Sequence, residues 1–312
     1  MHTVPTRLTV LALGGLLSAV GLGSAACSGA GSGASSGITV IASLYPFAFV
    51  ASRVGGADVQ VENLTSPGAE PHDLELTPRQ IADLSEASLV VYEHGFQPAV
   101  DDAVDQSGLG DDARVDVTEA VPLENTGAPA GGAPASGASG LDPHVWLDPV
   151  RMQAVTRLVA ARLASVDPAH AADYHTNATD LLAQLAGLDR AYRAGLAHCS
   201  RMTVVTSHAA FGYLAQRYGL TQIPIAGLDP TSEPAPAQQA AIADLVRRDG
   251  ITTIFTETLV SPAVAQSIAD EAGVSVATLD PIEGLSDSTS DQTYLTLMRS
   301  NLATLRAANG CS

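Results

Sequence analysis

The feature that most constrains the fold is the alternation of short β-rich runs with helical segments along most of the chain. Residues 38–43 (ITVIAS), 89–92 (LVVY) and 202–206 (MTVVT) are rich in β-branched side chains, and segments long enough for a helix separate them. This alternation predicts an α/β fold with parallel sheets flanked by helices. The expected strands are 38–43, 59–64, 89–92, 202–206, 223–226, 252–256 and 274–279, and the expected helices are 46–54, 211–218, 237–247, 262–272 and 293–308.

A long amphipathic segment divides this pattern in two. Between residues 168 and 196 apolar side chains recur at spacings of four and three, which places them on one face of a continuous helix. We therefore expect an N-terminal lobe over 38–166, a rigid linking helix over 167–198 and a C-terminal lobe over 199–312. In parallel sheets of this kind ligands bind beyond the carboxyl ends of the strands.

The N-terminus has the pattern of an export signal. An apolar run over 8–23 is too short to span a membrane, follows Arg7, and ends in small residues before Cys27. We expect residues 1–26 to be a signal peptide and Cys27 to be the lipidated first residue of a lipoprotein at the outer face of the cell membrane. Residues 27–37 contain almost only Ser, Gly and Ala and are expected to form a flexible tether. The alternative is secretion without lipid, either into the periplasm or out of the cell.

Charge and composition narrow the class of partner. The net charge of −18 disfavours nucleic acid and anionic lipid as partners. A Gly-, Ala- and Pro-rich insert at 125–140 is expected to be a disordered loop.

With Cys27 lipidated, Cys199 and Cys311 are candidates for a disulfide that ties the C-terminus to the second lobe; two free thiols are the alternative.

Four side chains lie where the predicted fold places a ligand. His72 follows the second strand, His144 lies within DPHVWLDP (142–149), and His208 and Asp280 each come directly after a strand. Three imidazoles and one carboxylate suit a divalent transition metal. Zinc is the first candidate, because it readily takes four nitrogen and oxygen ligands. A manganese or iron site is favoured where a carboxylate replaces one imidazole. Since these residues are far apart in the sequence, their spacing alone does not decide whether they form one site.

From Ile38 onward the chain resembles the metal-binding substrate receptors of bacterial ABC transporters, the cluster A-I group with ZnuA-like zinc and related manganese proteins. The motifs that carry the resemblance are PH with LTP (71–78), DPHVWLDP (142–149), SHAAFGY (207–213), EPAPAQ (233–238), FTE (255–257) and LDP (279–281).

The resemblance implies that His72, His144, His208 and Asp280 are the four metal ligands. It further implies two lobes joined by a rigid helix, Zn²⁺ as the transported ion with Mn²⁺ as the alternative, and a permease with its ATPase as partners. The resemblance also implies that the protein is a monomeric receptor and not an enzyme. A periplasmic or extracellular metallochaperone is a further candidate partner. Such zinc receptors often carry a His-rich loop before the DPH motif, and the insert here contains no His.

Several neighbouring residues have other expected roles. Glu257 is a candidate partner that fixes the tautomer of an imidazole, with an exposed loop carboxylate as the alternative. Trp146 is expected to pack beside the site, and Asp142 and Asp148 to cap turns or helix ends. His94 is a candidate extra donor. A zinc hydrolase and a surface adhesin are the competing functions, and the sequence contains no HExxH motif for the former.

Overall fold

A computed structural model describes residues 37–126 and 140–312 of the 312-residue chain. The predicted signal peptide, the lipidation site at Cys27, the tether up to residue 36 and most of the insert at 125–140 lie outside the described residues. The segment Gly37–Ser312 forms one compact unit. Within the described residues no helix combines the length and hydrophobicity that a membrane crossing requires.

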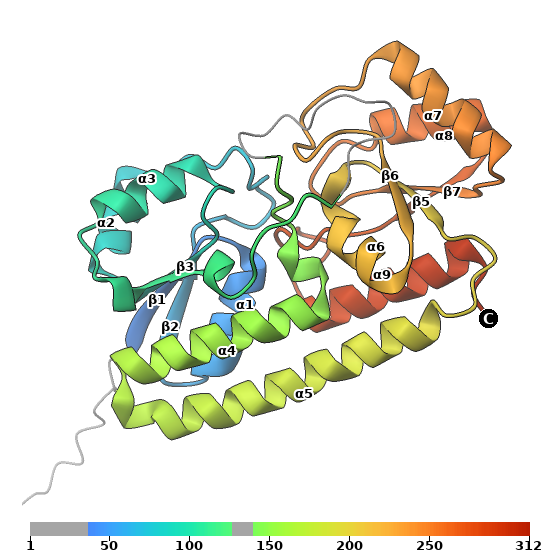
Figure 1. Cartoon of the computed structure of the whole chain (residues 1–312). Coiled ribbons are helices and arrows are strands. Elements are labelled where there is room, and N and C mark those ends of the chain that lie inside the picture. Colours follow the sequence, from blue (N-terminus) through green and yellow to red (C-terminus); the bar gives the residue numbers. More distant parts are fainter. Residues whose placement is uncertain (1–36, 127–139) are drawn as a thin grey trace, which may run out of the picture. The chain divides into compact units, whose positions relative to one another are not determined.

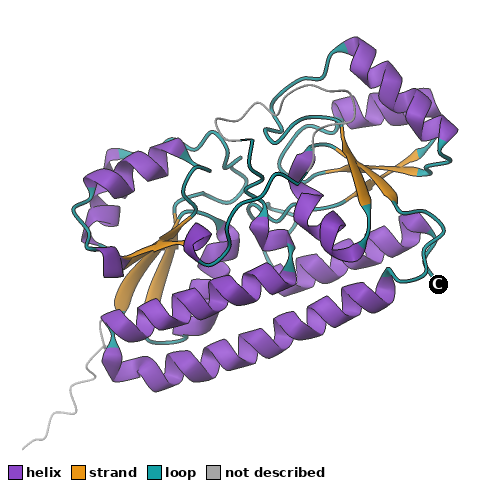
Figure 2. Ribbon diagram, in the orientation of Figure 1, coloured by secondary structure: helices purple, strands orange, loops and turns teal. Residues whose placement is uncertain are grey.

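The fold contains two parallel four-stranded sheets, with strand orders β2-β1-β3-β4 and β6-β5-β7-β8 (Figures 1 and 2). All pairs are parallel. The two sheets share one topology, which confirms the predicted α/β class. The strands of the first sheet are β1 (Ile38–Ala42), β2 (Val59–Asn63), β3 (Leu89–Tyr92) and β4 (Arg114–Asp116), and those of the second are β5 (Thr203–Thr206), β6 (Thr221–Pro224), β7 (Thr253–Thr256) and β8 (Ser275–Thr278).

Helices cover both faces of each sheet. In β1, Val40 and Ala42 face one hydrophobic cluster while Ile41 faces another, as the two-residue period of a strand requires. In the second sheet Val204 and Val205 of β5 divide between two clusters in the same way. The α-helices are α1 (Tyr45–Gly55), α2 (Pro78–Glu86), α3 (Pro98–Gln106), α4 (Pro149–Val166), α5 (Ala171–Gly195), α6 (Gly212–Tyr218), α7 (Pro236–Arg248), α8 (Ala263–Ala272) and α9 (Tyr294–Asn309).

Helix α5 is the predicted linking helix, and it lies beside α4 in Figure 1. It also contacts α1, which covers the first sheet, and α9, which follows the second. The Tyr192 hydroxyl donates to the carbonyl of Met298 in α9 over 2.7 Å. The predicted apolar stripe is buried, and it includes Leu196 just past the end of the helix. Its members within α5 are Tyr174, Ala178, Leu181, Leu185, Leu188 and Tyr192.

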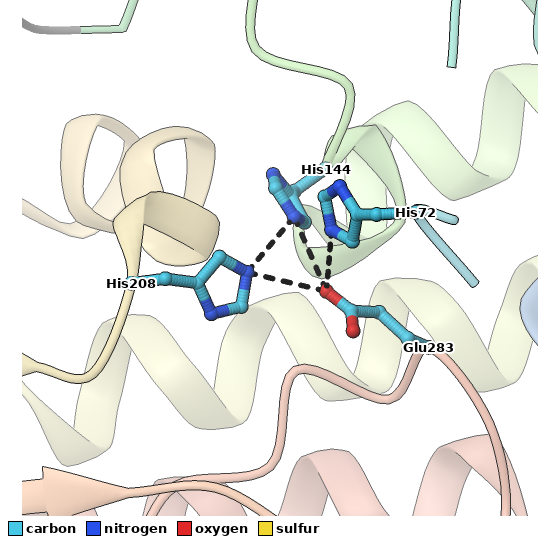
Figure 3. Close-up of side chains that lie close together, drawn as sticks. All are labelled: His72, His144, His208 and Glu283. Carbon is cyan, nitrogen blue, oxygen red and sulfur yellow. Dashed lines mark hydrogen bonds and ion pairs between the residues drawn. The ribbon is translucent and has the colours of Figure 1, made fainter. Parts of the chain in front are cut away.

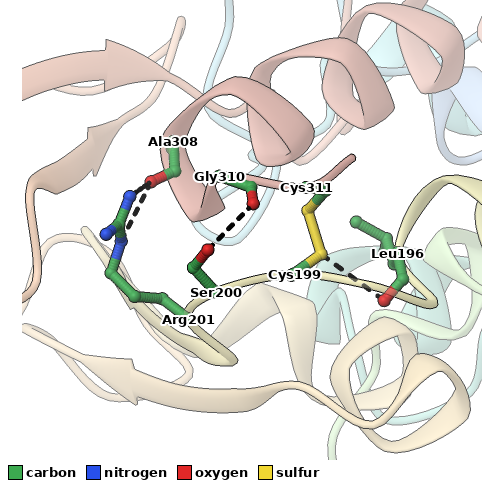
Figure 4. Close-up of a disulfide and its surroundings, with 7 residues drawn as sticks. All are labelled: Leu196, Cys199, Ser200, Arg201, Ala308, Gly310 and Cys311. Carbon is green, nitrogen blue, oxygen red and sulfur yellow. Dashed lines mark hydrogen bonds between the residues drawn. A yellow bond between two sulfur atoms is a disulfide. The ribbon is translucent and has the colours of Figure 1, made fainter.

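A disulfide between Cys199 and Cys311 joins the start of the second lobe to the C-terminus (Figure 4). Backbone contacts surround it, because Arg201 donates its backbone N–H to the carbonyl of Asn309 and Ser200 donates to that of Gly310. The structure therefore attaches the end of α9 to the segment that leads into β5.

Candidate metal centre

Three imidazoles and one carboxylate from distant parts of the chain point toward one another (Figure 3). They belong to His72, His144, His208 and Glu283, and each offers one ligand atom within 4.8 Å of all the others. Among the described residues this is the one group of three or more His, Cys, Asp or Glu side chains with that geometry.

The topology of the sheets explains why these residues meet. His72 follows β2 and His208 follows β5, while Glu283 lies beyond β8. His144 precedes a short 3-10 turn, Val145–Leu147, that leads into α4. Loops at the carboxyl ends of parallel strands converge, so both sheets contribute side chains to one site.

Four of the six distances between the ligand atoms match the edges of a zinc tetrahedron, and the other two, from His72 to the other histidines, are no longer than 4.8 Å. Oε1 of Glu283 lies 3.5 Å from Nε2 of His72, 3.2 Å from Nε2 of His144 and 3.3 Å from Nε2 of His208. The two Nε2 atoms of His144 and His208 are 3.2 Å apart. Zinc–nitrogen bonds of about 2.0–2.1 Å in a tetrahedral site separate the ligands by about 3.3 Å. A single ion therefore fits between these four atoms.

Burial leaves two ligand atoms of the cluster without a hydrogen-bond partner. The side chains of His144, His208 and Glu283 are almost fully buried, whereas that of His72 is 11% exposed. Nε2 of His72 and Oε1 of Glu283 are buried without a hydrogen-bond partner of good geometry. Unsatisfied buried polar atoms are unfavourable, and a metal ion at the centre would satisfy them together.

Carboxylates orient two of the imidazoles. Nδ1 of His144 lies 2.8 Å from Oδ1 of Asp142, and Nδ1 of His208 lies 2.7 Å from Oε2 of Glu257. Ionised carboxylates only accept hydrogen bonds, so each Nδ1 is the protonated nitrogen. The remaining nitrogen, Nε2, then faces the centre of the cluster with its lone pair available for a metal.

The same contacts change the proton affinity of the site. Burial lowers the pKa of His208, but the charge and hydrogen bond of Glu257, together with Glu283, outweigh burial and raise it well above the usual value. Burial also lowers the pKa of His144, but the nearby carboxylates of Asp142 and Glu283 outweigh burial and raise it. Burial raises the pKa of Glu283, but the three imidazoles that lie 3.2–3.5 Å from its Oε1 hold this pKa well below its usual range. A proton on Nε2 and a metal ion thus compete for one position.

His72 is held differently. Its backbone N–H donates to the carboxylate of Glu70, and its ring meets Phe96 edge-on with 4.8 Å between ring centroids. Because its side chain is the most exposed of the four, His72 marks the side from which solvent reaches the cluster.

The structure brings together the three predicted histidines with Glu283 rather than Asp280. Asp280 is not part of the cluster. Its Oδ1 accepts the backbone N–H of Ile282, and the chain turns at Ile282 so that the next residue faces the imidazoles. The sequence signal for Glu283 was weak, because this residue is five positions beyond the end of β8.

The other predicted residues fall into two groups. Glu257 is buried against His208, and Trp146 packs against the ring of His144 with 5.2 Å between centroids. Asp148 caps α4 as expected, whereas Asp142 contacts an imidazole in addition to shaping its turn. His94 lies outside the cluster, with a side chain that is 67% exposed and 3.3 Å from Asp101.

Proteins of described function are similar to this chain in sequence. A family model described as ZnuA, the periplasmic component A of a zinc-uptake complex, matches residues 40–308. The high-affinity zinc uptake system protein ZnuA of Bacillus subtilis (strain 168) is 31% identical over 274 residues, which cover 86% of both chains. The zinc-binding lipoprotein AdcA of Streptococcus pneumoniae serotype 4 is 32% identical over 279 residues, which cover 86% of this chain and 55% of AdcA. The chain thus spans about half the length of AdcA.

Solved structures agree with this relationship. The laminin binding protein Lmb of Streptococcus agalactiae, described as bifunctional with adhesin and metal transporting activity, superposes with a TM-score of 0.77 at 30% identity over 87% of this chain and 99% of Lmb. The Zn(II)-bound ZnuA-like domain of Streptococcus pneumoniae AdcA gives a TM-score of 0.73 at 30% identity over 88% of this chain and 99% of that domain. The sequence, the two-sheet architecture and the extent of the matches lead to one conclusion: this chain belongs to the ZnuA family.

Proposed function

We propose that the protein is the extracytoplasmic receptor of an ABC importer, and that it captures Zn²⁺ with His72, His144, His208 and Glu283. The observation that carries this proposal is the set of distances of 3.2–3.5 Å between inward-facing ligand atoms. Glu283 replaces Asp280 as the fourth ligand in this proposal. The family relationship supports delivery of the ion to a permease and its ATPase.

The donor set favours zinc over manganese. Imidazole nitrogen suits zinc, whereas manganese prefers sites rich in carboxylate and water oxygen. The buried centre has three nitrogen donors and one carboxylate, and its edges fit the short bonds of a four-coordinate ion. Relatives described as zinc-binding support the same choice.

A carrier fits this arrangement better than a hydrolase. A catalytic zinc site keeps one position open for water, whereas four protein ligands fill a tetrahedral site. The family is one of transport receptors, and the adhesin alternative rests on the descriptions of laminin-binding structural neighbours such as Lmb.

Elemental analysis after exposure to mixed metals tests the proposal. Wild-type protein offered equal free concentrations of Zn²⁺ and Mn²⁺ should retain about one equivalent of zinc. His208→Ala and Glu283→Gln should each lose most of it. His175→Ala is the matched control, because His175 is exposed on α5 outside the cluster. Wild-type affinity in His208→Ala would contradict the proposal.

We further propose lipid anchoring through Cys27. The apolar run and small residues before Cys27 support it, as does the description of AdcA as a lipoprotein. Full-length protein should partition into detergent with the membrane fraction, whereas Cys27→Ser should not. Equal partitioning of the two proteins would contradict anchoring at this residue.

A further inference from the structure

The loop after β8 has an unusual backbone at the residue before Glu283. Ile282 has φ = 58°, and among the described residues it is the one non-glycine residue with positive φ. It is also completely buried. A β-branched side chain rarely adopts the left-handed region because its Cβ substituents crowd the backbone, so neighbouring groups must hold this conformation.

The Asp280 side chain is one of the groups that hold it. Its Oδ1 accepts the backbone N–H of Ile282 over 2.8 Å, in a buried hydrogen bond. An Asp side chain that binds the backbone two residues further on forms a turn of its own. This turn sets the direction in which the chain leaves Pro281 and Ile282, and so the direction of Glu283.

Other buried side chains fix the position of Asp280 and Pro281. Asn301 of α9 accepts the backbone N–H of Asp280 over 2.9 Å and donates to its carbonyl over 2.6 Å. The indole of Trp146 donates to the carbonyl of Pro281 over 2.7 Å. The turn is thereby tied both to α9 and to the segment that carries His144.

We propose that Asp280 is a positioning residue, which holds the strained turn at Ile282 and thereby aims the Glu283 carboxylate at the three imidazoles. This inference rests on the proposed function, in which Glu283 binds the metal. It assigns to Asp280 a role that requires a hydrogen-bond acceptor and no negative charge. A metal ligand at the same position requires the charge.

Asparagine separates these two roles. In Asp280→Asn the amide oxygen still accepts the N–H of Ile282, and Asn tolerates such turns. We expect Asp280→Asn to bind Zn²⁺ within about fivefold of wild type, since the acceptor is kept and the lost charge belongs to a residue outside the cluster. Asp280→Ala removes the acceptor and should weaken binding by about 10–100-fold, the range typical of residues that orient ligands. Asp287→Ala is the control for loss of an exposed carboxylate further along the same segment.

Bound Co²⁺ reports the coordination directly. Wild type and Asp280→Asn should show the same intense visible bands of four-coordinate cobalt. Asp280→Ala should show weaker bands, because a displaced Glu283 lets water enter the coordination sphere. In a metal-free crystal structure of Asp280→Ala, the Glu283 carboxylate should be displaced from the imidazoles.

Two results would overturn the inference. One is an Asp280→Asn variant that loses zinc affinity and the cobalt bands as completely as Asp280→Ala. The other is a metal-free Asp280→Ala structure with Glu283 in its wild-type position, a result that does not depend on metal binding. Failure of wild-type protein to bind either metal would instead contradict the proposed function, and the metal-free structure would still decide the role of Asp280.

Discussion

Oε2 of Glu257 lies 2.7 Å from Nδ1 of His208, and both side chains are buried. Oε1 of the same carboxylate accepts the backbone N–H of His208 over 3.0 Å, so Glu257 holds both the ring and the main chain of this histidine. The ring cannot rotate without breaking a buried hydrogen bond. The orientation of Nε2 toward the cluster is therefore built into the second sheet, from β5 and the end of β7.

Glu257→Gln should lower zinc affinity by about 10–100-fold without removing a ligand. The amide oxygen can still accept one hydrogen bond, but the charge that favours the Nδ1–H tautomer is lost. A competition titration with a zinc chelator measures the change. Glu62→Gln, on an exposed face of β2, is the matched control and should leave the affinity unchanged. Equal affinities for the two variants would contradict this role.

Zinc affinity should fall steeply as the pH decreases from about 8 to about 5.5. In the metal-free protein the pKa values of His144 and His208 are raised, so a proton occupies the metal position at a higher pH than for an ordinary imidazole. The proton-bound form stabilises the metal-free fold at low pH, and that contribution is lost as the pH rises through the raised pKa.

The measurement for this prediction is the zinc-induced increase in melting temperature across the pH range. The increase should be large above neutral pH and small near pH 5.5, at the acid end of the imidazole range. An increase that is independent of pH would show that protons and zinc do not compete at Nε2.

Glu93 gives a prediction about stability rather than binding. It follows β3, is buried, and has no hydrogen-bond partner on either carboxylate oxygen. Burial raises its pKa well above the usual value, and the charges of Asp142, Asp116 and Asp101 add to this effect. The folded protein therefore keeps Glu93 protonated at pH values where the unfolded chain ionises it, so stability falls as the pH rises above the unfolded pKa.

Glu93→Gln should therefore increase the free energy of unfolding at pH 7, by about 1 kcal/mol. Near pH 4, where the wild-type carboxyl is mostly protonated in both states, the difference should become small. Urea unfolding of the metal-free proteins at the two pH values measures it. A variant less stable than wild type at pH 7 would show that the ionised carboxylate has a favourable role.

The sequence predicted much of the architecture, because apolar periodicity directly reports burial. The run 89–92 matched β3 exactly in extent, and the long apolar stripe located α5 within a few residues. No bounds were predicted for β4, α2, α3 or the 18-residue helix α4. β4 has only three residues, and α2 begins at Pro78 after a capping box formed by Thr77 and Gln80, a local signal that the apolar pattern does not contain.

The ligand set shows the limit of that reasoning. His208 lies two residues beyond the end of β5, so its position could be inferred from the strand. Asp280 also follows the strand signal closely, but the carboxylate that joins the three imidazoles belongs to Glu283, which follows a residue with positive φ. A β-branched residue in that conformation runs against its own preference, and the turn needs tertiary contacts from Asn301 and Trp146 in addition to its local hydrogen bond to Asp280. Local sequence patterns contain no record of such contacts.

The last prediction concerns the disulfide between Cys199 and Cys311, which encloses a sequence separation of 112 residues. In the chain-entropy view, closing a loop of this size restricts the unfolded chain strongly. Replacing both cysteines with Ser should therefore lower the free energy of unfolding by about 2–4 kcal/mol, measured by urea unfolding. Neither cysteine belongs to the cluster around Glu283, so zinc affinity should not change. A double variant with normal stability but weakened zinc binding would contradict a role for the disulfide in stability. That result would mean that the disulfide acts on the metal centre instead. The route would run from the attachment of α9 to the start of β5, through Asn301, to the turn that Asn301 supports.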